Sequence, residues 1–585
     1  MRKLSVLLGS IAVASVFVVP GALATHALPD EEVTVGSADS VMLQNKQNEP
    51  WVAINPINPT LLAAGVNDNI DLEGCNNKAD NDCPFTDGVG VSGVYFKLGS
   101  GGWTQPTYSG FSFRSCVGVV GSTDSCAPTQ PGPIGTLPLY FENRLVSDGD
   151  PSLSFGPRRG TSGFSWANGA RLYYANLTSN FLAVRNEELK GFEGVAVSRT
   201  DNGGATWLPP VVASKQSGSA FSDKESIVAD DAQSSAFFGN VYVCYTAFGS
   251  VGGPREPIFV SVSRDGGDTW TENKLSEAAN TGTGAGRQGC DVDTDSDGVA
   301  YVVWRGGETP KTNPPLFDRV IFMSRSLNGG VTWERPREIA QIQECGIFDP
   351  NQGRRSFDGV GGARVSLNPS LDVANGAPTG TNAPDTLVLT WCDGPTPSTA
   401  SGAKEEALLQ LSSNKGVSWT TPINAADTTQ GDRPDFPSVA ISPDGTDLYL
   451  TYMAFHAPWQ STTAAARTME GVVRHASLSG TLPGAFTTIH RGVSGDARGS
   501  TTNSLVAEFL GDYNYVAATN DFAYAVWNDV RNANDCPAID TFRQNLATGT
   551  TPNPRPAPQQ ACPPSGGKVF GNSDIFGTRV NDPTP

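Results

Sequence analysis

The feature that most constrains this chain is a short sequence, SRDGGDTW at Ser263–Trp270, that recurs in near copies. The other copies read TDNGGATW, SLNGGVTW and SSNKGVSW, and they end at Trp207, Trp333 and Trp419. The first three closing tryptophans are evenly spaced, and the fourth follows at a longer interval. Self-similarity at such a spacing predicts an architecture assembled from similar units.

Each copy combines turn-forming residues with an aromatic anchor. The Asp265 side chain is suited to accept hydrogen bonds from backbone N–H groups further along the turn, and Gly267 tolerates a positive φ. The closing indole of Trp270 buries a large apolar area. Because a hydrophobic run precedes every copy, each is predicted to cap a β-hairpin. We therefore assign a structural role to Ser263, Asp265, Gly267 and Trp270, and to Trp207, Trp333 and Trp419.

These turns resemble the Asp-boxes, or BNR repeats, of sialidases and related secreted β-propellers. The resemblance implies a propeller scaffold, and it implies that the turns lie on the rim away from the active site. The 65 glycines and 42 prolines, set among short Val, Ile, Tyr and Trp runs, indicate an all-β chain with many turns. We expect an all-β propeller of four-stranded blades, with seven blades; six, the number in true sialidases, is the alternative if the first unit is an insertion.

The chain order predicts how the ring begins and closes. Residues 1–27 have the pattern of a secretory signal peptide, with cleavage after Ala24 or Ala27, so the protein is expected to be secreted. Residues 28–48 form a lead segment, and 49–580 are expected to form a single propeller domain with disulfide-bearing insertions. The last unit shows three strands, so the lead, with a strand near Val33–Val35, is expected to supply the fourth and close the ring.

Charge and cysteine content limit the partners and the compartment. The formal net charge is −19, and loss of Arg2 and Lys3 with the signal makes it more negative, which disfavours nucleic acid and anionic membranes. No later apolar run is long enough to span a bilayer. The ten cysteines are expected to form disulfides, with local pairs Cys75/Cys83, Cys116/Cys126 and Cys536/Cys562. The partners of Cys244, Cys290, Cys345 and Cys392 stay open.

Charged residues, among them Glu49, Asp150 and Lys224, gather at the starts of the predicted first strands, which line the channel of a propeller. Sialidases clamp the substrate carboxylate with three arginines, and by blade position Arg287, Arg364 and Arg433 are the candidates. The resemblance implies a tyrosine nucleophile, for which Tyr513 is the candidate with Glu508 or Asp512 as base. Asp223 or Glu225 is the candidate acid/base. The Arg-Ile-Pro signature of sialidases is missing, and a structural role competes for every one of these residues.

An acidic run and a group of histidines contain residue types that bind metals. The run DVDTDSDG places Asp293, Asp295 and Asp297 at alternate positions, as in a calcium loop, but Trp304 stands where an EF-hand needs glutamate. A strand followed by an Asp/Gly turn is the favoured interpretation, and no cofactor is expected apart from this calcium option. Outside the signal segment the histidines are His456, His475 and His490, all in the sixth unit, where packing is favoured over a metal site.

The sequence supports more than one class of function. The first hypothesis is a secreted sialidase-like glycoside hydrolase that acts on terminal acidic sugars of glycans. The alternative is a non-catalytic propeller that binds a glycan or a protein at its channel mouth through its insertions. A lyase or another glycosidase on the same scaffold is a third. In each case the expected ligand is a carbohydrate or a glycoprotein.

Overall fold

The computed structural model describes residues 28–37, 46–72, 88–114, 129–181, 188–249, 256–276, 287–307, 319–365, 368–394, 405–456, 462–502 and 504–584. The predicted signal peptide lies outside the described residues, and so do Cys75, Cys83, Cys116 and Cys126.

The described residues form seven antiparallel blades around a central channel. Blade 1 contains β2 (Gln47–Ile54), β3 (Leu61–Asp68) and β4 (Ser92–Leu98). Blade 2 contains β8 (Ser152–Gly160), β9 (Gly163–Asn180), β10 (Gly194–Thr200) and β11 (Leu208–Val212), with β7 (Leu145–Ser147) on β9. Blade 3 contains β12 (Phe221–Ala229), β13 (Val241–Phe248), β14 (Ile258–Ser263) and β15 (Thr271–Lys274).

The remaining blades follow the same plan. Blade 4 contains β16 (Gln288–Thr294), β17 (Ala300–Gly306), β18 (Arg319–Ser326) and β19 (Arg337–Ile342). Blade 5 contains β22 (Ser370–Val373), β23 (Leu387–Asp393), β24 (Glu406–Ser412) and β25 (Ile423–Asn424). Blade 6 contains β26 (Arg433–Ile441), β27 (Asp447–Phe455), β28 (Thr468–Ser479) and β30 (Thr487–Arg491), with β29 (Leu482–Pro483) and β31 (Gly495–Asp496) on β28. Blade 7 contains β32 (Tyr515–Ala518), β33 (Phe522–Asp529), β34 (Asp574–Asn581) and β1 (Glu31–Glu32).

The inner strands close into a ring, which settles the number of blades. Each inner strand contacts the next in the order β2, β8, β12, β16, β22, β26 and β32, and β32 contacts β2 again. The first unit is therefore a blade of its own, with three strands in its sheet and a further bridge between Phe96 and Thr104. The expected all-β propeller with seven blades is confirmed, and the six-blade alternative is excluded.

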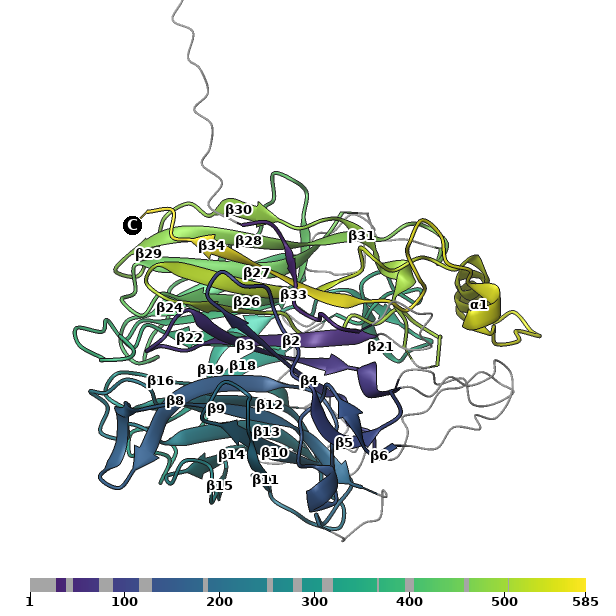
Figure 1. Cartoon of the computed structure of the whole chain (residues 1–585). Coiled ribbons are helices and arrows are strands. Elements are labelled where there is room, and N and C mark those ends of the chain that lie inside the picture. The colour runs from purple at the N-terminus through teal and green to yellow at the C-terminus, as the bar shows by residue number, and fades with distance from the viewer. Residues whose placement is uncertain are drawn as a thin grey trace, which may run out of the picture.

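The first and last strands of the described chain meet in blade 7. β1 pairs antiparallel with β34, with Glu31 opposite Gly577 and Glu32 opposite Phe576. The strand lies just before the predicted Val33–Val35, and Val33 continues the hydrogen bonding by donating to Ile575 O at 2.8 Å. Figure 1 places this N-terminal segment, in purple, beside the yellow C-terminal strands. Because β1 covers the outer side of β34, the C-terminal strand is paired on both sides.

The four recurring sequences form equivalent turns between the third and fourth strands of blades 2 to 5; we call them the tryptophan turns. In Ser263–Trp270 the Gly267 N–H donates to Ser263 Oγ at 2.8 Å, and the Thr269 N–H donates to Asp265 Oδ1 at 3.0 Å. Gly266 and Gly267 have φ of 85° and 88°, values that favour glycine. The same hydroxyl-to-glycine bond recurs in the other turns at Gly204, Gly330 and Gly416.

Each tryptophan turn also packs on the preceding blade. Trp207 donates to Tyr108 Oη of the insertion after blade 1, and Trp333 lies edge-on to Tyr242 of blade 3 at 6.5 Å between ring centroids. Apolar side chains of neighbouring blades fill the space between their sheets, as where Val243 of blade 3 packs with Tyr173 of blade 2. The turns therefore belong to the scaffold.

Disulfides and short elements complete the fold. Cys536–Cys562 is confirmed; it brackets the helices α1 (Pro537–Thr548) and α2 (Pro558–Ala561). The four cysteines whose partners the sequence left undetermined form the disulfides Cys244–Cys290 and Cys345–Cys392. Outside the blades lie the hairpins β5 (Tyr108–Ser112) with β6 (Thr129–Ile134) and β20 (Ile347–Asp349) with β21 (Arg354–Ser356), and the 3₁₀ turns Ile70–Leu72, Phe141–Asn143 and Ala497–Gly499. Among the described helices, none has the length and apolar character to cross a membrane.

Candidate active site

The inner strands begin at one mouth of the channel, opposite the tryptophan turns, because a turn after the third antiparallel strand lies at the other end of the blade. Irregularities in β2, β12, β16 and β26 occur at the same place, two or three residues into the strand. At these positions Glu49, Lys224, Gly289 and Phe436 have φ between 52° and 65°, and Asp150, just before β8, has 51°. These irregularities place one residue from each of these five blades at the shared mouth.

A positive φ at a non-glycine residue costs free energy and often marks a functional site. Here Phe436 and Gly289 adopt it without carrying a charge, so the bulge itself is a property of the scaffold. What differs between blades is the side chain that the bulge presents. Blades 1, 2 and 3 present Glu49, Asp150 and Lys224, and these charged groups are where chemistry is to be sought.

Lys224 is the centre of an ion-pair network. Its Nζ lies 3.2 Å from Asp150 Oδ2 and 3.6 Å from Glu49 Oε1, and it contacts Asp512 Oδ2. The Lys224 side chain is only 7% exposed. Burial alone would lower its pKa, but Asp150 and Asp512 raise the pKa of Lys224 well above its usual value. The ammonium is therefore charged at every physiological pH.

Arg364 is the second cation of the network. Its Nη2 donates to Asp512 Oδ2 at 2.6 Å, and its guanidinium lies over the Phe509 ring at 4.8 Å. Arg364 and Lys224 outweigh the effect of burial and lower the pKa of Asp512 to about 2. Unlike Lys224, the Arg364 side chain is 29% exposed, so it remains accessible to a ligand. We call Glu49, Asp150, Lys224, Arg364 and Asp512 the mouth cluster.

Glu49 and Asp150 divide one proton between them. Burial, and then the charge of Asp150, raise the pKa of Glu49 well above its usual value. Burial acts on Asp150 too, but Lys224 and a hydrogen bond from Glu49 outweigh it and lower the pKa of Asp150. Within the pair, Glu49 is therefore the group that holds a proton to the higher pH. Two carboxyl groups with pKa values driven apart are the arrangement from which acid and base roles arise.

Tyr513 lies beside this cluster. Its hydroxyl donates to Pro151 O at 3.3 Å, its ring lies edge-on to Trp51 at 6.1 Å, and Lys224 Nζ is 5.6 Å from its centroid. Burial and the charges of Asp150 and Glu49 raise the pKa of Tyr513 well above its usual value. The phenol is held protonated, which is the reverse of activation, and Asp512 is engaged with the two cations.

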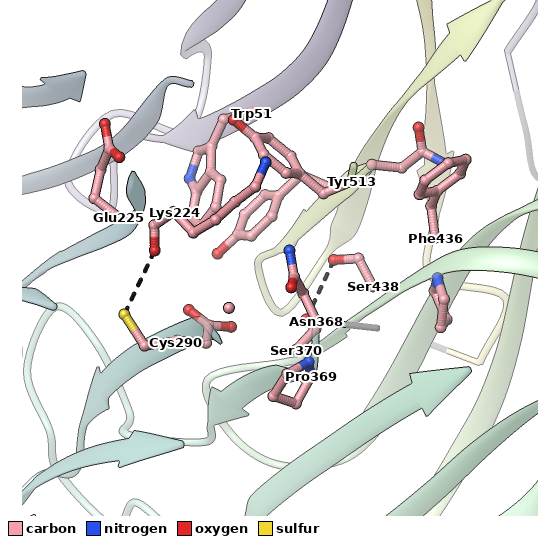
Figure 2. Close-up of a pocket in the computed structure, with 15 residues that line it drawn as sticks. Trp51, Lys224, Glu225, Cys290, Asn368, Pro369, Ser370, Phe436, Ser438 and Tyr513 are labelled. Atoms are coloured by element: carbon pink, nitrogen blue, oxygen red, sulfur yellow. Dashed lines mark hydrogen bonds between the residues drawn. The ribbon is translucent and has the colours of Figure 1, made fainter. Parts of the chain in front are cut away.

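A small cavity of about 50 Å³ lies next to these residues (Figure 2). Trp51, Lys224 and Tyr513 lie together on one side of it, and Asn368, Ser370 and Ser438 lie across from them. This volume accommodates a few water molecules, and not a sugar ring. Any larger ligand must sit above the cavity, at the mouth.

The two candidate acid/base residues differ in their surroundings. Asp223 is half-buried, and burial together with Asp150 and Asp512 raises its pKa to about 7, although Lys224 opposes the shift. Glu225 is 6% exposed, and within the described chain neither of its carboxyl oxygens has a hydrogen-bond partner. Burial, and then Asp150, raise the pKa of Glu225 well above its usual value. Asp223 is the better placed of the two for exchanging protons with solvent.

The other predicted site residues lie in separate networks. Arg433 makes two hydrogen bonds to Glu405, at 2.9 and 3.0 Å, and is buried. Arg287 lies near Glu256. Burial raises the pKa of Glu256, and the positive charges of Arg305 and Arg287 partly oppose this shift. Glu508 faces Arg467 Nη1 at 3.4 Å, and burial raises its pKa to about 7. Of the three arginines predicted to clamp a carboxylate, Arg364 belongs to the mouth cluster, and Arg287 and Arg433 do not.

The DVDTDSDG run forms a strand and a turn. Asp293 is on β16, and Asp295 Oδ1 accepts the N–H groups of Asp297 and Val299. Lys415 Nζ binds both Asp295, at 3.1 Å, and Asp297, at 2.6 Å. The turn oxygens are thereby occupied by protein donors, which matches the favoured strand-and-turn interpretation.

A second cavity of about 310 Å³ opens at the other mouth, on the side of the tryptophan turns. Asp231, Asp293 and Asp372 line it. Burial and the neighbouring Asp372 raise the pKa of Asp293, and burial raises the pKa of Asp372 to about 6. Like Glu49 and Asp150, these two carboxyl groups are joined by a hydrogen bond that divides a proton between them.

The sequence predicts charges at the strand starts, but it predicts catalytic and binding roles for other residues. Glu49, Asp150 and Lys224 have no predicted role beyond their place at a strand start, whereas in the structure they form the core of the mouth cluster. The signal that singles them out is their shared place two residues before the regular part of the inner strand, which begins at Trp51, Ser152 and Ser226. Which charges then pair depends on the ring, and no spacing along the chain encodes it.

No family model matches the sequence, and no curated protein matches it. The solved structures similar to this chain include a protein of unknown function from Dyadobacter fermentans, with 12% identity and TM-score 0.36 over 74% of this chain and 93% of that one. The intramolecular trans-sialidase from Ruminococcus gnavus is 13% identical, with TM-score 0.39 over 72% of this chain and 93% of that one. The phage phi92 endosialidase is 10% identical, with TM-score 0.38 over 95% of this chain and 69% of that one. The propeller assignment rests on this chain's own strand pairing.

Proposed function

We propose that this chain is a secreted, sialidase-like glycoside hydrolase that acts on terminal acidic sugars at the channel mouth where the inner strands begin. The observation that carries the proposal is the buried Glu49–Asp150 pair beside Lys224 Nζ, in which the pKa of Glu49 is raised and the pKa of Asp150 is lowered. Glycoside hydrolysis needs such an acid to protonate the leaving oxygen while a second group stabilises or attacks the anomeric carbon. The resemblance of the tryptophan turns to Asp-boxes supports the same class of enzyme.

The roles of the cluster follow from its charges. Glu49 donates the proton to the glycosidic oxygen, and Asp223, with a pKa of about 7, is the alternative donor from the same mouth. Arg364 binds the substrate carboxylate, because it is the half-exposed guanidinium of the cluster. Its bond to Asp512 must open for this, which limits the affinity for acidic sugars. Tyr513 as nucleophile stays part of the proposal, with its hydroxyl released from Pro151 O.

A second candidate is a non-catalytic propeller that binds a glycan or protein at the same mouth. The observation that favours it is that Arg364 and Arg433 each face a carboxylate of the protein, Asp512 and Glu405. A site whose cations are already neutralised binds acidic ligands weakly and tolerates neutral ones. This candidate predicts binding without turnover.

The decisive experiment measures release of the fluorophore from a fluorogenic sialoside, followed by a panel of acidic and neutral glycosides. We compare the wild-type protein with Glu49→Gln, Arg364→Ala and Tyr513→Phe. Loss of a general acid lowers kcat by roughly 10²–10⁴-fold, whereas Arg364→Ala raises KM. The matched control is Asn328→Ala in a tryptophan turn on the opposite face, which leaves both constants unchanged.

The outcomes separate the candidates. Turnover that is lost in Glu49→Gln and kept in Asn328→Ala supports the hydrolase. If Tyr513→Phe retains turnover while Glu49→Gln loses it, the carboxyl pair acts without a tyrosine nucleophile. Binding on a glycan array with no release from any glycoside of the panel overturns the hydrolase in favour of the binding protein.

A further inference from the structure

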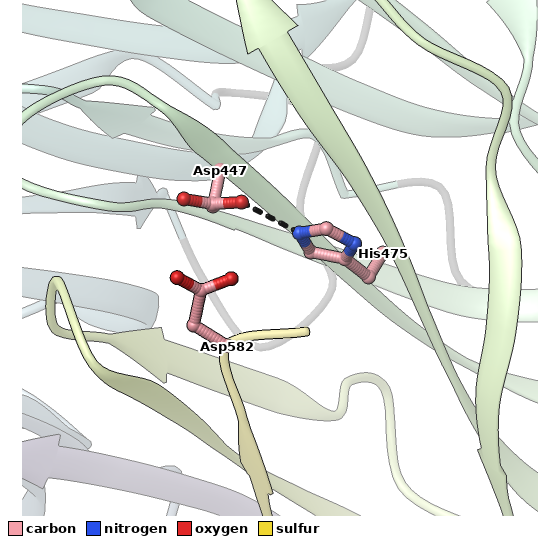
Figure 3. A group of neighbouring side chains, drawn as sticks. All are labelled: Asp447, His475 and Asp582. Carbon is pink, nitrogen blue, oxygen red and sulfur yellow. Dashed lines mark hydrogen bonds and ion pairs between the residues drawn. The ribbon is translucent and has the colours of Figure 1, made fainter. Parts of the chain in front are cut away.

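Three side chains of types that bind metals meet where blade 6 joins the C-terminal segment (Figure 3). Asp447 begins β27, His475 lies on β28, and Asp582 follows β34 of blade 7. One ligand atom from each lies within 4.8 Å of the others. His475 Nε2 is 2.7 Å from Asp447 Oδ1, and Figure 3 shows the Asp582 carboxylate turned toward both.

The strand pairing of blade 6 explains why the blade 6 groups share one side. His475 lies directly opposite Tyr449, and Asp447 is two residues before Tyr449 on the same face of β27. That face packs against blade 7, where Tyr449 contacts a core that includes Val580. Asp582, two residues beyond Val580, is thereby brought to the same place. Its backbone N–H is anchored on Asp521 O at 2.9 Å.

A buried hydroxyl at the site has no partner. Tyr449 is 0% exposed, and among the described residues its Oη makes no hydrogen bond. Its ring lies 5.2 Å from that of His475. An unsatisfied buried polar group is costly, and a water held by an ion at the site would satisfy it.

The geometry points to a site for a divalent transition-metal cation of the Zn²⁺ type, bound by Asp447, His475 and Asp582 with a water as fourth ligand. One imidazole nitrogen and two carboxylate oxygens suit Zn²⁺, whereas Ca²⁺ takes oxygen ligands alone. Thr584 Oγ1 lies 3.3 Å from Asp447 Oδ1 and 3.2 Å from Asp582 Oδ1, so it contacts both carboxylates.

The position of the site gives it a structural consequence. The C-terminal strand β34 pairs with both β33 and the N-terminal β1, so blade 7 closes the ring with the two ends of the chain. A metal bound to Asp582 and to two residues of blade 6 fastens the end of β34 to the neighbouring blade. Because a ligand that binds the folded state alone stabilises it, metal binding raises the melting temperature. Binding weakens at acidic pH, because protons compete for the imidazole and carboxylate ligands.

The test uses untagged, full-length secreted protein, stripped with EDTA and titrated with ZnCl₂, with CaCl₂ as a comparison. Metal content after dialysis, calorimetric affinity and melting temperature are measured for the wild type, His475→Gln, Asp582→Asn and His490→Gln. His490 is the matched control, because its Nε2 also binds an aspartate, Asp30, but outside any three-ligand group of the described residues. Asp582→Asn guards against misfolding of the buried His475 variant, because Asp582 is only half-buried.

We expect one bound Zn²⁺ per chain in the wild type and in His490→Gln, with a higher melting temperature than the stripped protein. Asp582→Asn and His475→Gln bind Zn²⁺ at least about tenfold more weakly and lose the thermal shift. The proposal is overturned if the stripped wild type takes up no Zn²⁺. It is equally overturned if Asp582→Asn binds Zn²⁺ as tightly as the wild type, because the metal then lies elsewhere.

Discussion

Lys224 Nζ lies 3.2 Å from Asp150 Oδ2, and this contact links blade 3 to blade 2 across the mouth of the channel. The same ammonium faces Glu49 of blade 1 and Asp512, which precedes β32 of blade 7. One buried cation thus neutralises carboxyl groups from three other blades. Ion pairs between residues of different blades therefore stabilise the mouth.

Removing this cation leaves buried carboxylates without compensation. Lys224→Met is expected to lower the free energy of unfolding by about 3–5 kcal/mol, the range for breaking a buried ion pair from one side. Denaturant unfolding measures the loss. The control is Lys215→Met, because Lys215 is 66% exposed and 4.0 Å from Glu272, and a surface pair is worth at most about 1 kcal/mol. Equal losses in the two variants would contradict a buried network at the mouth.

The tryptophan turns are predicted to affect stability and not the mouth. In one of them Asn328 Oδ1 accepts the Thr332 N–H at 2.9 Å, and Nδ2 donates to Thr332 Oγ1 at 2.8 Å. Asn328→Ala removes both bonds and is expected to cost about 1 kcal/mol, because the turn is exposed. Leu327→Ala, at a 56% exposed neighbour, should stay within about 0.5 kcal/mol. A change in ligand binding in Asn328→Ala would mean that the turn face takes part in function.

The fold followed from the sequence because its signals are local and repeated. Ser263, Asp265 and Trp270 specify one turn through bonds within eight residues, and four copies reveal the blade. The site followed only in part. The strand starts located Glu49 and Lys224, but their partners come from other blades and meet only when the ring closes. Arg433 is the clearest case, since its partner Glu405 lies on the preceding blade at no characteristic spacing.

The disulfide Cys244–Cys290 joins β13 of blade 3 to β16 of blade 4 and closes a loop across a sequence separation of 46. In the chain-entropy model such a loop contributes about 4 kcal/mol, so Cys244→Ala/Cys290→Ala should lower the free energy of global unfolding by about that amount. The comparison is Cys536→Ala/Cys562→Ala, which frees only the insertion with α1 and α2. Hydrogen exchange should show loosening confined to that insertion. Global destabilisation by the second pair would contradict its local role.

The pH dependence of stability is set by buried carboxyl groups. Burial raises the pKa to about 7 for Asp148, Asp223, Asp231, Asp291 and Glu508. Because the folded protein holds these protons more tightly than the unfolded chain, whose carboxyl pKa is about 4, their contribution is complete below about pH 4. It is lost as the pH rises toward 7. Asp512 acts in the opposite sense: with a folded pKa of about 2, its contribution is present above about pH 4 and is lost below it.

The melting temperature should therefore be highest near pH 4 and fall on both sides. Differential scanning calorimetry at constant ionic strength, from pH 3 to pH 8, measures the profile. Asp231→Asn reduces the fall between about pH 4 and 7, because the amide imitates the protonated carboxyl and its oxygen still accepts the bond from Asn375 Nδ2. Asp297→Asn, at an exposed carboxylate, leaves the slope unchanged. A melting temperature that rises steadily from pH 5 to pH 8 would show that the buried carboxyl groups do not hold their protons in the folded state.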